Sequence, residues 1–151
     1  MPEFNNHPLD EPGISNRFIE PCILVIFGAT GDLTARKLLP AIYNLAREGQ
    51  LPAQFACVGF ARRDKTNEQF RQEMRTALDQ FARTKPVDEN LWQAFSKKIF
   101  YHRSPFDDDQ GYDSLNKKLQ ELDQTFHTEG NRLFYLATPP SYFPLIVEKI
   151  Q

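Results

Sequence analysis

Residues 22–35 read Cys-Ile-Leu-Val-Ile-Phe-Gly-Ala-Thr-Gly-Asp-Leu-Thr-Ala, and this stretch decides the fold. The six apolar residues from Cys22 to Phe27 form a continuous run, as is typical of a central strand that is covered on both faces. Gly28 ends the run, and apolar side chains then recur at helical spacing from Leu33 to Glu48. The stretch is therefore predicted to form a buried strand, a glycine turn and a helix that packs back on the sheet.

The same alternation of short apolar runs and helical periods continues along the chain, which is typical of βαβ units with a parallel sheet. Pro40 is expected to kink or restart the first helix, because its ring removes an amide donor. Gly49 is expected to end that helix, and Thr66 and Gln69 have the spacing of a capping box. Strands are expected at 22–27, 55–60, 99–102 and 133–137, and helices at 33–48, about 67–81, 91–96, 110–126 and 142–150.

The predicted fold class is α/β, with a doubly wound parallel sheet. Nucleotide-binding sheets of this kind usually contain about six strands. Because only four are expected here, the domain looks truncated after the fourth strand and its helix.

The composition is that of an ordinary globular protein, with 40% hydrophobic and 25% charged residues in 151. A net charge of −2 supplies no positive field for nucleic acid or an anionic membrane, and no apolar run could span a bilayer. Cys22 and Cys57 have no metal-ligand spacing, so we expect buried thiols in a reducing compartment, no metal site and a cytoplasmic location. Residues 1–20 are rich in proline, and their apolar residues do not recur at the spacing of a strand or a helix. This predicts a disordered tail before a folded unit at 21–151.

The turn from Gly28 to Leu33 lies between a strand and a helix, where a phosphate-binding turn would be placed. Glycines there let the backbone approach a pyrophosphate, and the first N–H groups of the helix hold its charge. The match to GxGxxG is incomplete, since Ala29 or Thr30 replaces the second glycine and the third is missing. A tight turn without a ligand therefore remains an alternative. A P-loop is excluded, because Gly-Lys-Ser/Thr is absent.

Arg62 and Arg63 follow the second strand, where an NAD enzyme would present a carboxylate to the ribose hydroxyls. An arginine can instead pair with a 2′-phosphate in a forked geometry and lie flat on the adenine. The pair therefore favours NADP over NAD, and a solvated arginine pair at a strand end is the alternative. The acidic residues 107–109 are interpreted as a helix cap rather than a magnesium site.

No catalytic residue is evident in the sequence. His7 lies in the tail, His102 ends a strand and His127 ends a helix. No Ser/His/Asp or Cys/His arrangement can be assembled from the remaining residues. The sequence therefore predicts a cofactor site without visible catalytic chemistry.

Three stretches resemble the coenzyme-binding part of the glucose-6-phosphate dehydrogenase family, in the order in which the family has them. They are Phe-Gly-Ala-Thr-Gly-Asp-Leu-Thr-Ala-Arg-Lys-Leu-Leu-Pro-Ala at 27–41 with Gly-Gln-Leu-Pro at 49–52, Val-Gly-Phe-Ala-Arg-Arg at 58–63, and Asn-Arg-Leu-Phe-Tyr-Leu-Ala-Thr-Pro-Pro at 131–140. The resemblance implies a Rossmann-like sheet and NADP-dependent oxidation of glucose 6-phosphate to 6-phosphoglucono-1,5-lactone, the first step of the pentose phosphate pathway.

The resemblance also implies roles for individual residues. Residues 28–35 would form the dinucleotide loop, with the Thr30 hydroxyl and Arg62 on the 2′-phosphate, and Lys37 would face the pocket between the nicotinamide and the sugar phosphate. Residues 104–105 would border the adenosine half, and residues 137–140 would pass beneath the nicotinamide. The expected cofactor-binding residues are Gly28, Ala29, Thr30, Gly31, Asp32, Leu33, Thr34, Ala35, Lys37, Arg62, Ser104, Pro105, Ala137, Thr138, Pro139 and Pro140.

Two of the family's motifs are absent from the sequence, namely the Arg-Ile-Asp-His-Tyr-Leu-Gly-Lys stretch with the catalytic base and a Glu-Lys-Pro segment. The chain is therefore expected to be the N-terminal part of the coenzyme domain, without the substrate domain and its dimer interface, and inactive alone. The full-length enzyme is expected to be a homo-oligomer. One alternative is a stand-alone NADP-binding or sensing module. Another, an interaction protein with an accidental glycine turn, would require three motif matches by chance.

Overall fold

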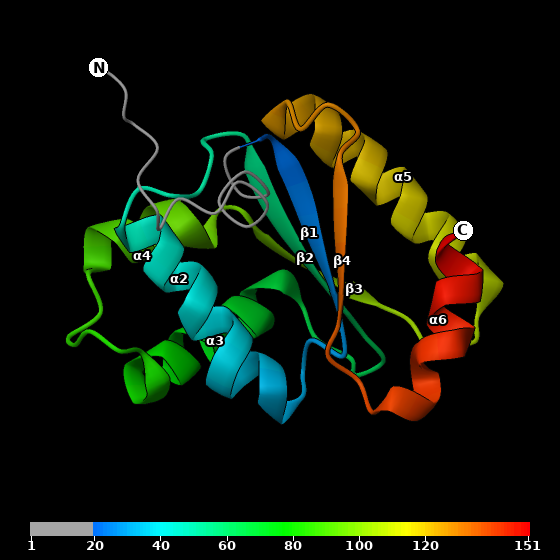
Figure 1. The fold of residues 1–151 in the computed structure, drawn as a ribbon, viewed down its shortest axis with the longest axis horizontal. Helices are drawn as coiled ribbons and strands as arrows, with labels where there is room; N and C mark the ends of the chain where they lie inside the picture. Colours follow the sequence, from blue (N-terminus) through cyan, green and yellow to red (C-terminus); the bar gives the residue numbers. More distant parts are fainter. Residues whose placement is uncertain (1–19) are drawn as a thin grey trace, which may run out of the picture.

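The structure, a computed structural model, describes residues 20–151, so the predicted disordered tail lies outside this range except for Glu20. A parallel four-stranded sheet has the order β3-β2-β1-β4 and confirms the predicted α/β class (Figure 1). The strands are β1 (Cys22–Phe27), β2 (Phe55–Ala61), β3 (Ile99–Arg103) and β4 (Arg132–Leu136). β1 pairs with β2 along its whole length and with β4 from Ile23 onward.

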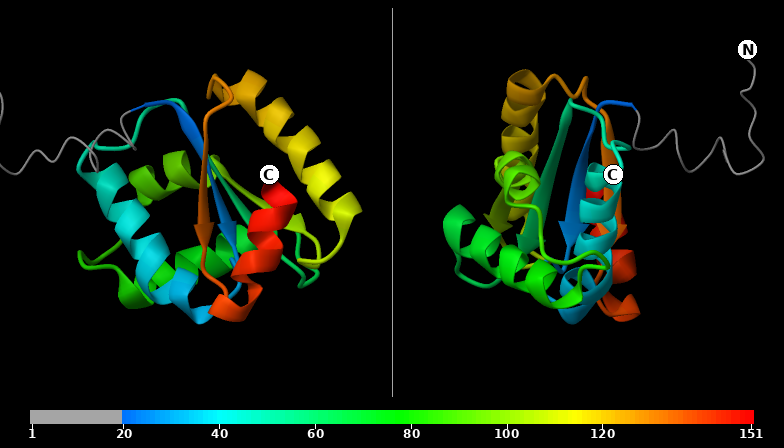
Figure 2. Two further views of the ribbon diagram at one scale, coloured as in Figure 1. Left: turned by 45° about the vertical axis from the view of Figure 1, so that its right-hand side comes forward. Right: turned by 90° about the vertical axis from the view of Figure 1, so that its left-hand side faces the viewer.

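Helices cover both faces of the sheet (Figure 1; Figure 2, left). They are α2 (Leu39–Arg47), α3 (Asn67–Phe81), α4 (Glu89–Ser96), α5 (Asp109–Phe126) and α6 (Phe143–Ile150). Alternate residues of β1 and β2 pack with α2, α3 and α4 on one face, and the intervening residues pack with α5 and α6 on the other. Every residue of β1 and β2 is buried, which is why their sequences are continuous apolar runs rather than alternating ones.

The predicted interruption at Pro40 is present. A π-helical turn, η1 (Thr34–Leu38), precedes α2, and Pro40 lies in the first turn of α2, where a missing N–H is tolerated. Gly49 ends the helix with a φ of +70°, as expected. Its N–H donates to the Ala46 carbonyl and the Gln50 N–H donates to the Leu45 carbonyl, which is the hydrogen-bond pattern of a Schellman motif.

Side-chain caps fix where the next helices begin. The capping box of α3 is confirmed, because Thr66 Oγ1 accepts from the Gln69 N–H at 3.0 Å and Gln69 Oε1 accepts from the Thr66 N–H at 2.9 Å. α4 begins two residues earlier than predicted, since Asp88 accepts from the Leu91 N–H. The predicted cap of α5 is confirmed, since Asp108 of the acidic triplet accepts from the Gln110 N–H. A short 3₁₀ turn, η2 (Pro140–Tyr142), precedes α6.

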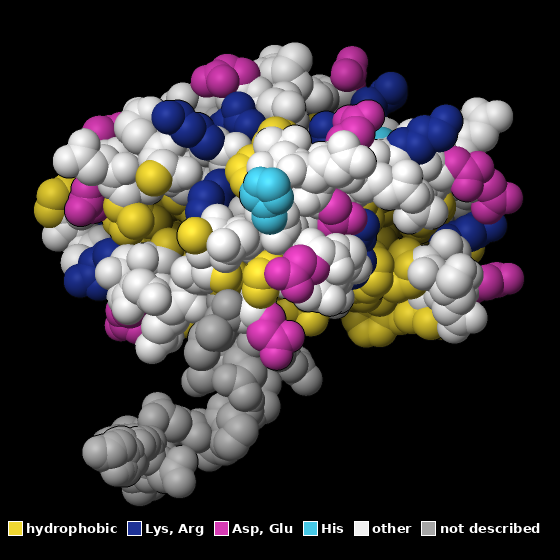
Figure 3. Space-filling view, turned by 90° about the horizontal axis from the view of Figure 1, so that it is seen from above, with side chains coloured by type: hydrophobic (Ala, Val, Ile, Leu, Met, Phe, Trp, Pro, Cys, Tyr) yellow, Lys and Arg dark blue, Asp and Glu magenta, His cyan; other side chains and the backbone are white. Residues whose placement is uncertain are grey.

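Charged residues of both signs are distributed over the end of the molecule at which the strands begin (Figure 3). None of the helices within residues 20–151 is both long and apolar enough to span a membrane. The same residues contain no group of three His, Cys, Asp or Glu side chains that could hold a metal ion. The prediction of buried thiols is confirmed, since Cys22 and Cys57 lie in the core and burial raises the pKa of Cys57 to about 12.

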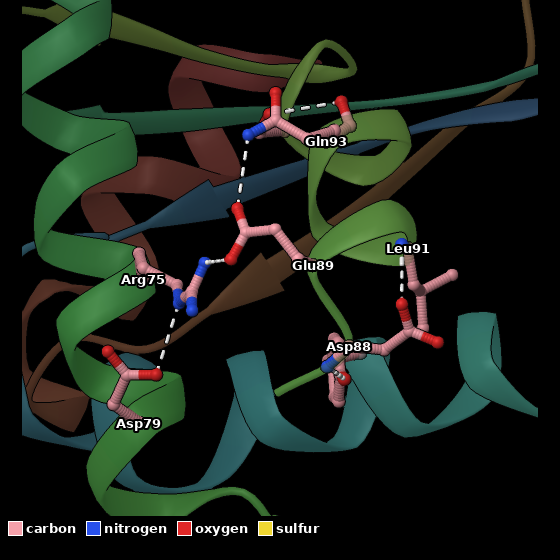
Figure 4. Close-up of polar contacts among 8 residues, drawn as sticks. Arg75, Asp79, Asp88, Glu89, Leu91 and Gln93 are labelled. Atoms are coloured by element: carbon pink, nitrogen blue, oxygen red, sulfur yellow. Dashed lines mark hydrogen bonds and ion pairs between the residues drawn. The ribbon is translucent and has the colours of Figure 1, made fainter. Parts of the chain in front are cut away.

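A polar cluster joins α3 to α4 on the surface (Figure 4). The Arg75 guanidinium of α3 donates to Asp79 at 3.1 Å and to Glu89 of α4 at 2.7 Å, and Gln93 also donates to Glu89. Hydrogen bonds from Arg75 and Gln93 lower the pKa of Glu89. Because exposed ion pairs contribute little stability, the cluster adds little to the free energy of unfolding.

Candidate cofactor-binding site

A cleft with a volume of about 490 Å³ lies at the edge of the sheet where the strands end. The chain proceeds from β1 to β2 and β3 on one side, whereas β4 lies on the other side of β1. In open α/β sheets, ligands bind at such a switch point, beyond the carboxyl ends of the strands. The cleft is lined by Gly28, Thr30, Gly31, Ala61, Arg62, Arg63, Pro105, Phe106, Asp107, Ala137, Thr138, Pro139, Tyr142 and Leu145.

The turn after β1 has a conformation that only glycine fits. Gly28 has a φ of +85° and its N–H donates to the Phe60 carbonyl at 2.9 Å. A Cβ at Gly28 would lie 2.9 Å from both the Ala137 carbonyl oxygen and Thr138 Cγ2. The backbones after β1 and β4 therefore approach each other at the floor of the cleft without an intervening side chain.

Hydrogen bonds within the turn hold it closed. The Gly28 carbonyl accepts from the Gly31 N–H at 3.0 Å and from the Thr34 hydroxyl at 3.3 Å. A Cβ at Gly31 would meet that carbonyl at 3.2 Å. The first N–H groups of the helical segment that follows have no acceptor within the helix. The turn thus combines an open backbone with a helix N-terminus, which suits a phosphate group.

Two arginines at the end of β2 line the same cleft as this turn. Arg62 and Arg63 are both exposed, and neither guanidinium forms an ion pair with another residue of the described range 20–151. Asp107, on the loop after β3, also lines the cleft. The loops after β2 and β3 therefore bring to the cleft one carboxylate and two cations that have no ion-pair partner among residues 20–151.

The structure brings eight of the sixteen predicted residues to the cleft wall: Gly28, Thr30, Gly31, Arg62, Pro105, Ala137, Thr138 and Pro139. The other eight lie off that wall. Ala29, Thr34 and Ser104 are buried and Ala35 is half-buried, whereas Asp32, Leu33, Lys37 and Pro140 are exposed. Asp32 pairs with Arg36 at 2.8 Å.

Six lining residues were not assigned from the sequence: Ala61, Arg63, Phe106, Asp107, Tyr142 and Leu145. Arg63 carried the same signal as Arg62, and Phe106 directly follows a residue that was assigned. No motif near Tyr142 in the sequence indicates that it lines the cleft. It does so because its ring packs edge-on against Phe106, a residue distant in sequence, with ring centroids 5.3 Å apart.

The two histidines of the described range, His102 and His127, belong to structural features of the fold. His102 Nε2 lies 3.0 Å from both the Gly111 carbonyl and the Ser114 hydroxyl, and its ring stacks on Phe60. Burial lowers the pKa of His102. His127 ends α5 in the left-handed conformation, with a φ of +56°, and His7 lies outside the described residues.

Known proteins resemble this chain over nearly all of its described length. The family model for the glucose-6-phosphate dehydrogenase NAD binding domain matches residues 25–151. Glucose-6-phosphate 1-dehydrogenase of Chlamydia pneumoniae is 60% identical over 136 residues, which are 90% of this chain and 26% of that protein. The Bacillus subtilis protein of the same name is 40% identical over 131 residues, covering 85% and 25%.

A solved structure of glucose-6-phosphate dehydrogenase in complex with its substrate glucose-6-phosphate superimposes with a TM-score of 0.78 at 36% identity. The match covers 88% of this chain and 27% of that one, so the chain spans about a quarter of the length of these relatives. The sheet order and this match confirm the predicted Rossmann-like fold. The chain belongs to the glucose-6-phosphate dehydrogenase family, and its residues 25–151 match the NAD binding domain of that family.

Proposed function

We propose that the cleft binds NADP and that residues 21–151 supply part of the coenzyme domain of a glucose-6-phosphate dehydrogenase. One observation carries the proposal. A turn that excludes side chains, at Gly28, shares a cleft with Arg62 and Arg63, whose guanidinium groups have no carboxylate partner among the described residues. Ligand pockets typically have volumes of about 300–1,000 Å³, a range that includes this cleft.

The arrangement suits both charged parts of NADP. The pyrophosphate fits beside the turn from Gly28 to Gly31, where no Cβ intervenes and helix N–H groups are available. The 2′-phosphate fits beside Arg62, with the hydroxyl of Thr30, which lines the same cleft, as a further donor. The residues from Ala137 to Pro139, at the end of β4, support the nicotinamide side. When bound, NADP supplies the hydride acceptor, and the chain's own residues bind and orient it.

The choice of NADP over NAD rests on charge at the end of β2. An enzyme that prefers NAD places a carboxylate there to accept the ribose hydroxyls, and that carboxylate repels a 2′-phosphate. Here the first residue after the strand is Arg62, followed by Arg63. The eight predicted residues that lie off the cleft wall are still proposed to belong to the cofactor site, on the basis of the family resemblance.

For the protein as a whole, we propose NADP-dependent oxidation of glucose 6-phosphate to the lactone, in a cytoplasmic homo-oligomer. The names of the relatives, and a relative solved with glucose-6-phosphate, support this substrate. The buried thiols suit a reducing compartment. A stand-alone NADP-binding module is not favoured, because the relatives found are dehydrogenases.

Calorimetric titration of NADP and NAD tests the proposal. Arg62→Ala should weaken NADP binding roughly tenfold to hundredfold, since a charge-assisted contact contributes about 1.5–3 kcal/mol. It should leave NAD binding nearly unchanged. Arg47→Ala removes the same charge at the end of α2 and should change neither. Equal losses for the two cofactors on Arg62→Ala would remove Arg62 from the 2′-phosphate role.

A further inference from the structure

We infer that Tyr101 is a positioning residue for the 2′-phosphate, because its phenol holds the carbonyl of Arg63 and thereby fixes the bend that carries both arginines. Tyr101 itself does not line the cleft. The inference rests on the proposed NADP site and adds a specificity-determining residue on a neighbouring strand.

The β2–β3 pairing ends where the two arginines begin. The last paired residues are Ala61 and Arg103. The final hydrogen bond between the two strands is donated by the Ser104 N–H to the Ala61 carbonyl, at 2.9 Å. The next two carbonyls accept from side chains of β3 instead of its backbone. Arg62 O accepts from Arg103 Nε at 3.3 Å, and Arg63 O accepts from the Tyr101 hydroxyl at 2.6 Å.

Tyr101 is well placed to act as a rigid support. Its side chain is 7% exposed and its ring packs against Phe70, with centroids 5.0 Å apart. Its backbone N–H donates to Asn67 Oδ1 at 2.7 Å, so the residue is tied to both the bend and the first residue of α3. Burial raises the pKa of Tyr101, which keeps the phenol protonated as a donor.

The effect of this support should be confined to one part of the cofactor. The glycine turn is anchored separately, through the Gly28 N–H and the Phe60 carbonyl. Among residues 20–151, the hydroxyl of Tyr101 hydrogen-bonds to the arginine bend alone. Loss of the hydroxyl is therefore expected to make the positions of the two guanidinium groups less fixed, while the pyrophosphate site keeps its geometry. The affinity for NADP should fall and the affinity for NAD should not.

Tyr101→Phe tests the inference because it removes a single oxygen from a buried ring. NADP binding to the 151-residue chain should weaken roughly threefold to tenfold, the range expected for one neutral hydrogen bond, while NAD binding stays within about twofold. Tyr43→Phe is the matched control. Its hydroxyl is also buried and accepts from the Asp88 N–H at 3.0 Å, but it lies between α2 and α4. Tyr43→Phe should leave the NADP-to-NAD affinity ratio unchanged.

Thermal melts of both variants accompany the titrations, so that a loss of folded protein is measured separately. A loss of affinity that is equal for NADP and NAD, or no loss at all on Tyr101→Phe, would overturn the positioning role. A wild-type chain that binds NADP no better than NAD would overturn the proposed function first and this inference with it. A wild-type preference for NADP that Tyr101→Phe retains in full would overturn only the inference.

Discussion

Gly59 of β2 leaves the space that the side chain of Ala29 occupies. A Cβ added at Gly59 would lie 2.7 Å from Ala29 Cβ and 2.6 Å from Phe70 Cζ. In the GxGxxG pattern the third glycine permits the close packing of helix on strand. Here a glycine on the neighbouring strand lets both Ala29 of the turn and Phe70 of α3 pack closely against β2.

Gly59→Ala should therefore destabilise the fold by about 1–3 kcal/mol, the usual cost of overpacking a core. Denaturant unfolding measures the change. In a Phe70→Leu background the same substitution should cost less, because the ring atoms nearest the added methyl are gone. An unchanged unfolding midpoint for Gly59→Ala would show that the core accommodates the methyl without strain.

Local signals in the sequence predicted most of the fold. The apolar run of β1, the capping box at Thr66 and the helix-ending Gly49 are each encoded within a few residues, so they could be recognised without the rest of the chain. The start of α4 shifted by two residues because it depends on a single cap, Asp88, and the ends of β2, β3 and β4 shifted by one residue because strand pairing fixes them.

The cleft could be predicted only in part, because its walls are built from contacts distant in sequence. Phe106 meets Tyr142, and Tyr101 holds Arg63, and no spacing rule relates these pairs. The resemblance pointed to loops that line the cleft, but it did not distinguish residues on the cleft wall from residues off it. Ser104 illustrates this, since it is buried and its hydroxyl donates to the Pro105 carbonyl.

Gly31→Val should abolish binding of both NADP and NAD, because a branched side chain would occupy the space that the pyrophosphate needs. This outcome differs from the selective loss expected for Arg62→Ala. Gly49→Ala, where no atom lies within 4 Å of the added Cβ, should retain binding. If a folded Gly31→Val variant bound NADP normally, the loop would be a tight turn with no role in binding.

Asp123 makes the stability of the chain depend on acid pH. Its carboxylate accepts from Arg132 at 2.8 and 2.6 Å and from the Thr128 hydroxyl, and the hydrogen bonds from Arg132 hold its pKa below the usual value of about 3.9. The stabilisation is present above the unfolded-state pKa and is lost as pH falls through the lower folded-state value.

Asp123→Asn should therefore lower the free energy of unfolding by about 1.5–3 kcal/mol at neutral pH, and the difference from wild type should shrink below about pH 4. Urea unfolding at a series of pH values measures this. Asp79→Asn, in an exposed pair with Arg75, should cost less than about 1 kcal/mol. A difference for Asp123→Asn that stays constant down to pH 2 would exclude the assigned pKa shift.

The 151-residue chain alone should show no turnover of glucose 6-phosphate. Oxidation at the sugar C1 requires a base within about 3 Å of the hydroxyl proton, and its loss typically costs ~10²–10⁴-fold in rate. Within the described part of the chain, His102 is held by Gly111 and Ser114 rather than being free. NADPH absorbance with saturating substrate should not rise. Turnover that disappears on His102→Asn would show that a base had been missed.

Chemical-shift mapping by NMR during titration with NADP tests the NADP site most directly. The largest amide shifts are predicted at Gly28, Gly31, Arg62 and Arg63, and titration with NAD should shift the two glycines while leaving the two arginines close to their free positions. Shifts concentrated in the polar groove between α3 and α4, or identical shifts at Arg62 and Arg63 for both cofactors, would contradict an NADP site in this cleft.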